Sequence, residues 1–183
     1  FFWSTHYKMF KHLQTMIDKN INTRSYLEIG PGHGLFSFYS INKLKKLTHF
    51  TAVDISKTSL NLTINFIKSL ISKNKLIDYE FIEGDFLKIK QNKKKYDLIV
   101  CGEVLEHVKN PNKLLNNINV FLNKNGKVFI STCINCPAID HVNQFNKVED
   151  ITKLFKKLKF KIISQKILPV EKVNYTNALK KKI

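Results

Sequence analysis

Two carboxylates and an imidazole occur close together in the order Glu103-Val-Leu-Glu106-His107. Positions i, i+3 and i+4 lie on one face of a helical turn, so the three side chains can converge. Together they offer oxygen and nitrogen ligands to a divalent cation such as Mg²⁺, Mn²⁺ or Zn²⁺. A fourth ligand is needed, and His141, in an irregular segment after a predicted strand, is the best candidate. Alternatively, His107 and His141 could act as general bases or simply pack in the fold.

A glycine-rich loop is the second feature that could do chemistry. An apolar strand pattern over residues 26–29 includes Glu28 and leads into the run Gly30-Pro31-Gly32-His-Gly34, after which a helical pattern begins. Glycines allow positive φ and let the backbone approach a ligand, and the start of a helix presents free N–H groups. This layout of strand, glycine turn and helix is typical of sites for nucleotide-type cofactors.

The elements that must position these residues alternate between strands and helices. This alternation predicts an α/β, Rossmann-like, doubly wound sheet of seven strands that are mostly parallel. The last two predicted strands have no helix between them, so we expect an antiparallel pair at one edge, with the last strand antiparallel. The predicted strands cover residues 24–30, 50–54, 78–83, 96–101, 127–132, 160–168 and 173–179, and the predicted helices cover 6–21, 35–44, 56–73, 111–125 and 148–158. The strand at 96–101 is apolar enough to be buried on both faces. Ser56 can cap the helix at 56–73, and Gly126 is a natural stop for the helix at 111–125.

Polar or flexible residues stand where several predicted strands end, which is where such sheets bind ligands. Asp54 follows the second strand, twenty residues after Gly34, where an acid can accept hydrogen bonds from ribose hydroxyls. Asp85 and Phe86 follow the third strand and suit an adenine, the acid taking the amino group and the ring stacking on its face. Each acid could instead cap the next helix.

The ordered set of motifs resembles the class I S-adenosylmethionine-dependent methyltransferases over almost the whole chain. In that family an E/D-x-G-x-G-x-G loop holds the methionine part of the cofactor. The acid after the second strand holds the ribose, and an aspartate after the third holds the adenine. The resemblance also implies the seven-stranded sheet. The implied cofactor-binding residues are Glu28, Gly30, Pro31, Gly32, Gly34, Asp54, Ile55, Asp85, Phe86, Cys101 and Gly102.

The cluster around Glu103 is similar to two groups within that family. Residues 101–111, the Ile-Ser-Thr run at 130–132 and the later histidine look like the ubiquinone-pathway O-methyltransferases. Small-RNA 2′-O-methyltransferases share the Glu-x-x-Glu-His and later His arrangement. Members of both groups hold a divalent metal with two glutamates and two histidines. This resemblance implies the metal ligands Glu103, Glu106, His107 and His141.

Composition limits the partners and the compartment. The formal net charge is +17, but Arg24 is the only arginine among 31 basic residues. The guanidinium of arginine is the usual bidentate ligand for phosphates and base edges. Because arginine is nearly absent, a nucleic-acid partner is possible but not favoured. Three cysteines cannot form a disulfide framework, which indicates the cytoplasm. Cys133 and Cys136 form a single C-x-x-C pair, too few ligands for a closed zinc site, and we expect them to shape the substrate pocket.

The sequence thus predicts one methyltransferase domain over residues 1–183 and no membrane span. Residues 1–22 form a helix over the site, and residues 133–146 form a loop for the methyl acceptor. The predicted activity is O-methylation of a small polar metabolite, polyhydroxylated or phosphate-bearing, with help from a divalent metal. The alternatives are an RNA ribose 2′-O-methyltransferase and a non-catalytic cofactor-binding protein. The sequence leaves the oligomeric state and any residues upstream of Phe1 open.

Overall fold

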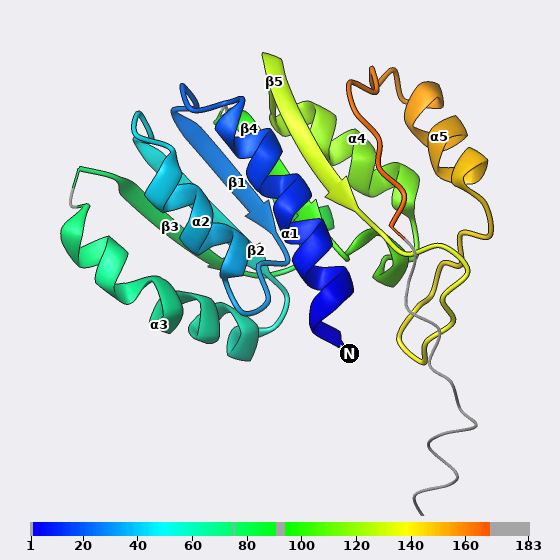
Figure 1. The fold of residues 1–183 in the computed structure, drawn as a ribbon, viewed down its shortest axis with the longest axis horizontal. Helices are drawn as coiled ribbons and strands as arrows, with labels where there is room; N and C mark the ends of the chain where they lie inside the picture. Colours follow the sequence, from blue (N-terminus) through cyan, green and yellow to red (C-terminus); the bar gives the residue numbers. More distant parts are fainter. Residues whose placement is uncertain (1, 75, 91–93, 169–183) are drawn as a thin grey trace, which may run out of the picture.

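A five-stranded parallel sheet lies at the centre of the protein (Figure 1). The computed structural model describes residues 2–74, 76–90 and 94–168. The strands are β1 (Ser25–Ile29), β2 (His49–Asp54), β3 (Asp78–Glu83), β4 (Tyr96–Gly102) and β5 (Leu122–Ser131). The helices are α1 (Phe2–Asp18), α2 (Leu35–Lys43), α3 (Lys57–Lys73), α4 (Pro111–Phe121) and α5 (Val148–Lys157), with short 3₁₀ helices η1 (Phe86–Lys88) and η2 (Leu105–His107).

Strand order places the glycine loop at the centre of the sheet. The order is β3-β2-β1-β4-β5, so β1 pairs with β2 on one side and with β4 on the other. The chain leaves β1 toward β2, whereas β4 occupies the opposite flank. This is the point where strand order reverses, and ligands of doubly wound sheets bind in the crevice outside it.

Successive side chains along each strand point alternately into two separate hydrophobic cores. Tyr26 in β1 and Leu98 in β4 belong to the core that α1, α2 and α3 cover. Leu27 and Ile99, their neighbours in sequence, belong to the core beneath α4. Successive residues of a strand point to opposite faces, so strands covered by helices on both sides are apolar throughout. This explains the continuous apolar run predicted to be buried at residues 96–101.

Local signals set the starts of two helices that support the site. The Ser56 hydroxyl accepts a hydrogen bond from the Ser59 N–H at 3.2 Å, which confirms the predicted cap of α3. The Asn110 side chain likewise accepts from the Lys113 N–H at 3.0 Å, and Pro111 occupies the first turn of α4.

The prediction of seven strands with the last antiparallel is wrong for the part of the chain that is described. All five strands there are parallel, and residues 160–168 have no regular structure. A strand needs a neighbour for its backbone hydrogen bonds. The predicted neighbour of residues 160–168 was the segment 173–179, which lies outside the described residues. Ile163 and Ile167 remain exposed, at 73% and 65%.

The boundary between α4 and β5 also differs from the prediction. Gly126 was expected to stop the helix, but α4 ends at Phe121 and β5 begins at Leu122. A Cβ atom on Gly126 would lie 2.8 Å from the Tyr96 carbonyl oxygen, at an irregularity in the pairing of β4 with β5. Gly126 therefore permits close approach of two strands, a role that local sequence does not distinguish from a helix stop.

Replacing Leu98 with alanine tests the importance of the core beneath α1. Leu98 is completely buried at the centre of β4, so L98A should lower the free energy of unfolding by about 2–5 kcal/mol. The matched control is L76A, because Leu76 is 96% exposed and its loss should cost less than about 0.5 kcal/mol. Urea denaturation measures both values, and equal losses would contradict this description of the core.

Candidate functional site

The glycine loop is held tightly on both sides and open in the middle. Gly30, Gly32 and Gly34 have φ values of 67°, 56° and 81°, which glycine adopts without strain. A Cβ on Gly30 would lie 2.6 Å from Cγ2 of Val104, and one on Gly34 would lie 3.0 Å from Cα of Thr63. A Cβ on Gly32 would meet nothing within 4 Å. The loop therefore presents its backbone to open space at Gly32.

Glu28, a predicted cofactor ligand, is buried near the end of β1. Its side chain is 2% exposed, and its carboxylate accepts hydrogen bonds from the Tyr26 hydroxyl at 2.8 Å and the Ser37 hydroxyl at 2.6 Å. Burial raises the pKa of Glu28 to about 7, although these two hydroxyls favour the ionised form. Glu28 thus ties β1 to α2 and supports the loop from inside the core.

Asp54 and Ile55 stand at the carboxyl end of β2. The Asp54 Oδ1 atom accepts a hydrogen bond from the Ser56 N–H at 2.8 Å, which orients the carboxylate. The Asp54 carbonyl oxygen accepts from the Gly84 N–H, which joins the ends of β2 and β3. Ile55 is 76% exposed beside this acid. An oriented carboxylate and an open apolar side chain suit a ribose and the adjoining adenine ring.

Asp85 and Phe86 follow β3 but face different surroundings. The Asp85 Oδ1 atom accepts from the Leu87 N–H at 2.9 Å and so caps η1, the alternative role considered for this acid. The Phe86 ring is 5% exposed and packs 5.3 Å from the Phe121 ring in the core. The expected stacking of this ring on adenine is therefore not available in this structure.

Cys101 and Gly102 form the end of β4. Cys101 is completely buried, and burial raises the pKa of its thiol far above the usual range. A Cβ on Gly102 would lie 2.8 Å from the Phe36 ring, so glycine makes room for this ring beside the strand end. The Cys101 side chain therefore belongs to the core beneath α4.

The four predicted metal ligands gather at this same edge. Glu106, His107 and His141 offer ligand atoms that all lie within 4.8 Å of one another. Glu103 belongs to a second group with Glu106 under the same limit. The Glu106 carboxylate is 1% exposed and accepts a hydrogen bond from the Thr132 hydroxyl at 2.9 Å. Tertiary structure therefore brings His141 to residues that lie more than thirty positions earlier.

Backbone hydrogen bonds hold His141 in this place. The Val142 and Asn143 N–H groups donate to the Glu106 carbonyl oxygen at 3.0 and 2.9 Å. They fold the segment 133–146 back over η2, and the rings of His107 and His141 meet edge to face with centroids 4.9 Å apart. Glu103 has a φ of 53°, a left-handed conformation that is uncommon for glutamate and that occurs preferentially at functional sites.

Both histidines are in the same tautomer. The Nδ1 atom of His107 lies 3.0 Å from the carbonyl oxygen of Asp140, and that of His141 lies 2.7 Å from the carbonyl oxygen of Cys136. A carbonyl oxygen can only accept, so each Nδ1 carries the proton. Each Nε2 is then left with a lone pair, as in a metal-binding histidine oriented by a backbone carbonyl.

Cys133 is a member of the cluster that the sequence analysis missed. Its sulfur belongs to the second group, with Glu103 and Glu106, inside the same 4.8 Å limit. Burial, followed by the negative charge of Glu106, raises the pKa of the Cys133 thiol to about 12. The overlooked signal was its position just after β5, since strand ends in this fold carry the site.

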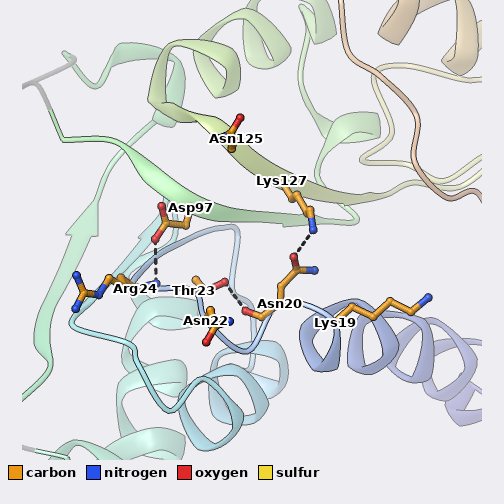
Figure 2. Close-up of a pocket in the computed structure, with 8 residues that line it drawn as sticks. All are labelled: Lys19, Asn20, Asn22, Thr23, Arg24, Asp97, Asn125 and Lys127. Carbon is orange, nitrogen blue, oxygen red and sulfur yellow. Dashed lines mark hydrogen bonds between the residues drawn. The ribbon is translucent and has the colours of Figure 1, made fainter.

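A hollow in the described part of the chain lies at the opposite edge of the sheet (Figure 2). It measures about 490 Å³, and its lining includes Arg24 just before β1 and Asp97 near the start of β4. The Asp97 carboxylate accepts from the Arg24 N–H at 2.9 Å, and Lys127 donates to the Asn20 side chain. None of the predicted site residues lines this hollow, so it is separate from the carboxyl-edge site.

Comparison with known proteins assigns the class. The family model described as "Methyltransferase domain" matches residues 22–182. The chain belongs to this family and is a class I S-adenosylmethionine-dependent methyltransferase, with S-adenosylmethionine as the methyl donor.

Three relatives illustrate the likeness. The ubiquinone biosynthesis O-methyltransferase of Pelagibacter ubique is 33% identical over 117 residues, covering 63% of this chain and 44% of the relative. A Clostridium acetobutylicum S-adenosylmethionine-dependent methyltransferase structure shares 16% identity with a TM-score of 0.68, covering 91% and 87% of the two chains. The structure of Bradyrhizobium japonicum NodS, an N-methyltransferase in complex with S-adenosyl-L-homocysteine, shares 18% sequence identity with a TM-score of 0.54. The match covers 67% of this chain and 61% of NodS.

The two kinds of likeness carry different weight. The chain spans about half the length of the curated relatives that it matches. At these identities, the two solved structures establish the fold alone. No helix in the described residues is long and apolar enough to cross a membrane.

The buried Glu28 should make stability depend on pH. Its pKa is about 7 in the folded protein and about 4.5 ordinarily, so its contribution is fully present below pH 4.5 and is lost as pH rises through 7. The E28Q variant cannot ionise. Relative to E28Q, the wild type should therefore lose about 3 kcal/mol of unfolding free energy between pH 4.5 and 8. Urea titrations across this range measure the difference, and parallel profiles would contradict it.

Proposed function

We propose that the protein is an O-methyltransferase that modifies a small polar acceptor, polyhydroxylated or phosphate-bearing, beside the cluster of Glu103, Glu106, His107 and His141. The supporting observation is that this cluster adjoins the glycine loop. The side chain of Val104, inside the cluster, lies against the position that a Gly30 side chain would occupy. A methyl donor on the loop and an acceptor at the cluster would be neighbours, as an in-line displacement requires.

S-adenosylmethionine fits the edge formed by β1, β2 and β3. The glycine loop, which is open at Gly32 and also contains Gly30, Pro31 and Gly34, would take its methionine part. Asp54 would accept hydrogen bonds from the ribose, with Ile55 against the adenine and Asp85 near its amino group. The backbones of Phe86, Cys101 and Gly102 would line the remaining edge. When bound, the cofactor supplies a methyl group on a sulfonium that is a good leaving group.

A divalent cation fits the cluster as well. Glu106 is a buried carboxylate, and no lysine or arginine of the described residues forms an ion pair with it. A buried charge without a countercharge is costly, so a cation would offset it. Glu103, Glu106 and the Nε2 atoms of His107 and His141 would hold the ion. When bound, a cation lowers the pKa of an acceptor hydroxyl. Without one, either histidine could accept that proton through Nε2.

The surroundings of the cluster agree with this role. The segment 133–146 lies over η2 and would form the acceptor pocket, and the N-terminal end of α1 lies near the ends of β1 and β5 (Figure 1). The three cysteines of the chain are too few for a disulfide framework, which favours a cytoplasmic enzyme. RNA ribose methylation remains the alternative, and it predicts binding that weakens steeply with salt. A non-catalytic cofactor-binding role predicts cofactor binding without turnover.

Replacing Asp54 with asparagine tests the cofactor site. D54N removes a charged acceptor at the proposed ribose position, and such hydrogen bonds contribute about 1.5–3 kcal/mol. The affinity for S-adenosylmethionine, measured by isothermal titration calorimetry, should fall about 10- to 100-fold. D78N is the matched control, because Asp78 begins β3 at the opposite edge of the sheet. Unchanged affinity of D54N for S-adenosylmethionine would show that Asp54 does not bind the ribose.

A methyl-transfer screen tests the reaction and the cation together. Catechols, sugars, sugar nucleotides and short RNAs are offered as acceptors, each with and without Mn²⁺, Mg²⁺ or Zn²⁺. We expect transfer to a small polyhydroxylated or phosphate-bearing acceptor, lost on chelation and reduced at least about tenfold in E106Q. The control is E149Q, since Glu149 is exposed at the start of α5. Turnover that survives chelation and E106Q would overturn the role of the cation.

A further inference from the structure

We propose that Cys133 is a direct thiolate ligand of the cation at this cluster, which makes the site selective for Zn²⁺, Co²⁺ or Fe²⁺ over Mg²⁺. The inference rests on the proposed cation site and adds a ligand to it. It follows from where the sulfur lies, and not from the C-x-x-C spacing.

Cys133 lies at the junction of the two groups that share Glu106. With Glu103 and Glu106 it forms a set of three ligand atoms within 4.8 Å of one another. Its sulfur is also 3.5 Å from the ring of His141, on the side of Nδ1 and not of the proposed ligand atom Nε2. The sulfur therefore contacts a residue of each set. Two overlapping sets thus include five potential ligands, one more than the four expected from the Glu-x-x-Glu-His motif and the later histidine.

The separations are compatible with a bound ion. With metal–sulfur and metal–oxygen bonds of about 2.3 and 2.1 Å, two ligands of one ion lie about 3.1 to 4.4 Å apart, depending on the angle between them. The three ligand atoms lie within 4.8 Å of one another, so small side-chain rotations can bring them into this range. Cys133 lies two residues after the end of β5, and Thr132 between them donates a hydrogen bond to Glu106. The hydrogen bond of Thr132 thus holds the chain next to Cys133 beside Glu106.

A sulfur ligand changes which cation is preferred. Carboxylates suit Mg²⁺, Mn²⁺ and Zn²⁺, whereas a thiolate favours the softer Zn²⁺, Co²⁺ and Fe²⁺ over Mg²⁺. Binding forms one metal–sulfur bond and breaks the S–H bond, and the proton is released to solvent. No oxidant or reductant is required. The thiolate and its two neighbouring carboxylates would then offset the positive charge of the ion.

Cobalt spectroscopy of the whole protein tests this ligand. Co²⁺ is added to metal-free protein without oxygen. We expect visible bands from the bound ion, together with a near-ultraviolet band of sulfur-to-cobalt charge transfer. C133S should keep the visible bands, lose the charge-transfer band, and weaken Zn²⁺ binding by at least about tenfold while Mg²⁺ binding changes less. C136S is the matched control: it retains the backbone carbonyl that orients His141 and should keep the band.

Wild-type protein supplies a second measurement in case C133S does not fold. Bound Zn²⁺ should protect Cys133, but not Cys136, from alkylation by iodoacetamide, as read by peptide mass spectrometry. Visible bands without charge transfer, or a charge-transfer band that persists in C133S, would overturn the thiolate ligand and leave the cation site standing. Failure of Co²⁺ and Zn²⁺ to bind at all would overturn both. Loss of the band in C136S alone would assign the sulfur to Cys136.

Discussion

The close contact between Gly30 and Val104 is the constraint on which the functional edge depends. A side chain on Gly30 would overlap Val104, so glycine there lets the segment after β4 lie against the end of β1. Because β4 pairs directly with β1, the contact joins the cofactor loop to the cluster at Glu103 and Glu106. Methyl donor and acceptor must meet within van der Waals distance for an in-line transfer, and this packing would make the two proposed sites adjacent.

Two buried carboxylates at this edge are accommodated in different ways. Glu28 is surrounded by the hydroxyls of Tyr26 and Ser37, and its raised pKa allows it to be neutral near pH 7. Glu106 receives the Thr132 hydroxyl and lies beside potential metal ligands. Neutral hydroxyl partners suit a carboxyl group that stabilises the core, whereas a group of metal-ligating side chains suits a bound cation. Similar burial therefore accompanies a structural role in one and a proposed binding role in the other.

Local patterns predicted much of the fold. The strand predicted at residues 78–83 coincides with β3, and Ser56 caps α3 as expected. Apolar periodicity and capping chemistry act over a few residues, so sequence alone reveals them. The failures involve pairing between distant segments. The segment 160–168 does not form a strand, and its predicted pairing partner lies outside the described residues. Gly126 does not end a helix but allows the close contact between β4 and β5.

The sequence was sufficient to identify the class of enzyme, because the glycine loop, Asp54 and the Glu103–Glu106 motif follow strand ends in a fixed order. It could not say which side chains face the ligand. Tertiary packing turned the Phe86 ring into the core, left Ile55 exposed, and closed the segment 133–146 over Glu106. That closure also brought Cys133 to the carboxylates. Spacing along the chain decides which residues share a turn, whereas contacts across thirty residues depend on how the whole sheet and its loops pack.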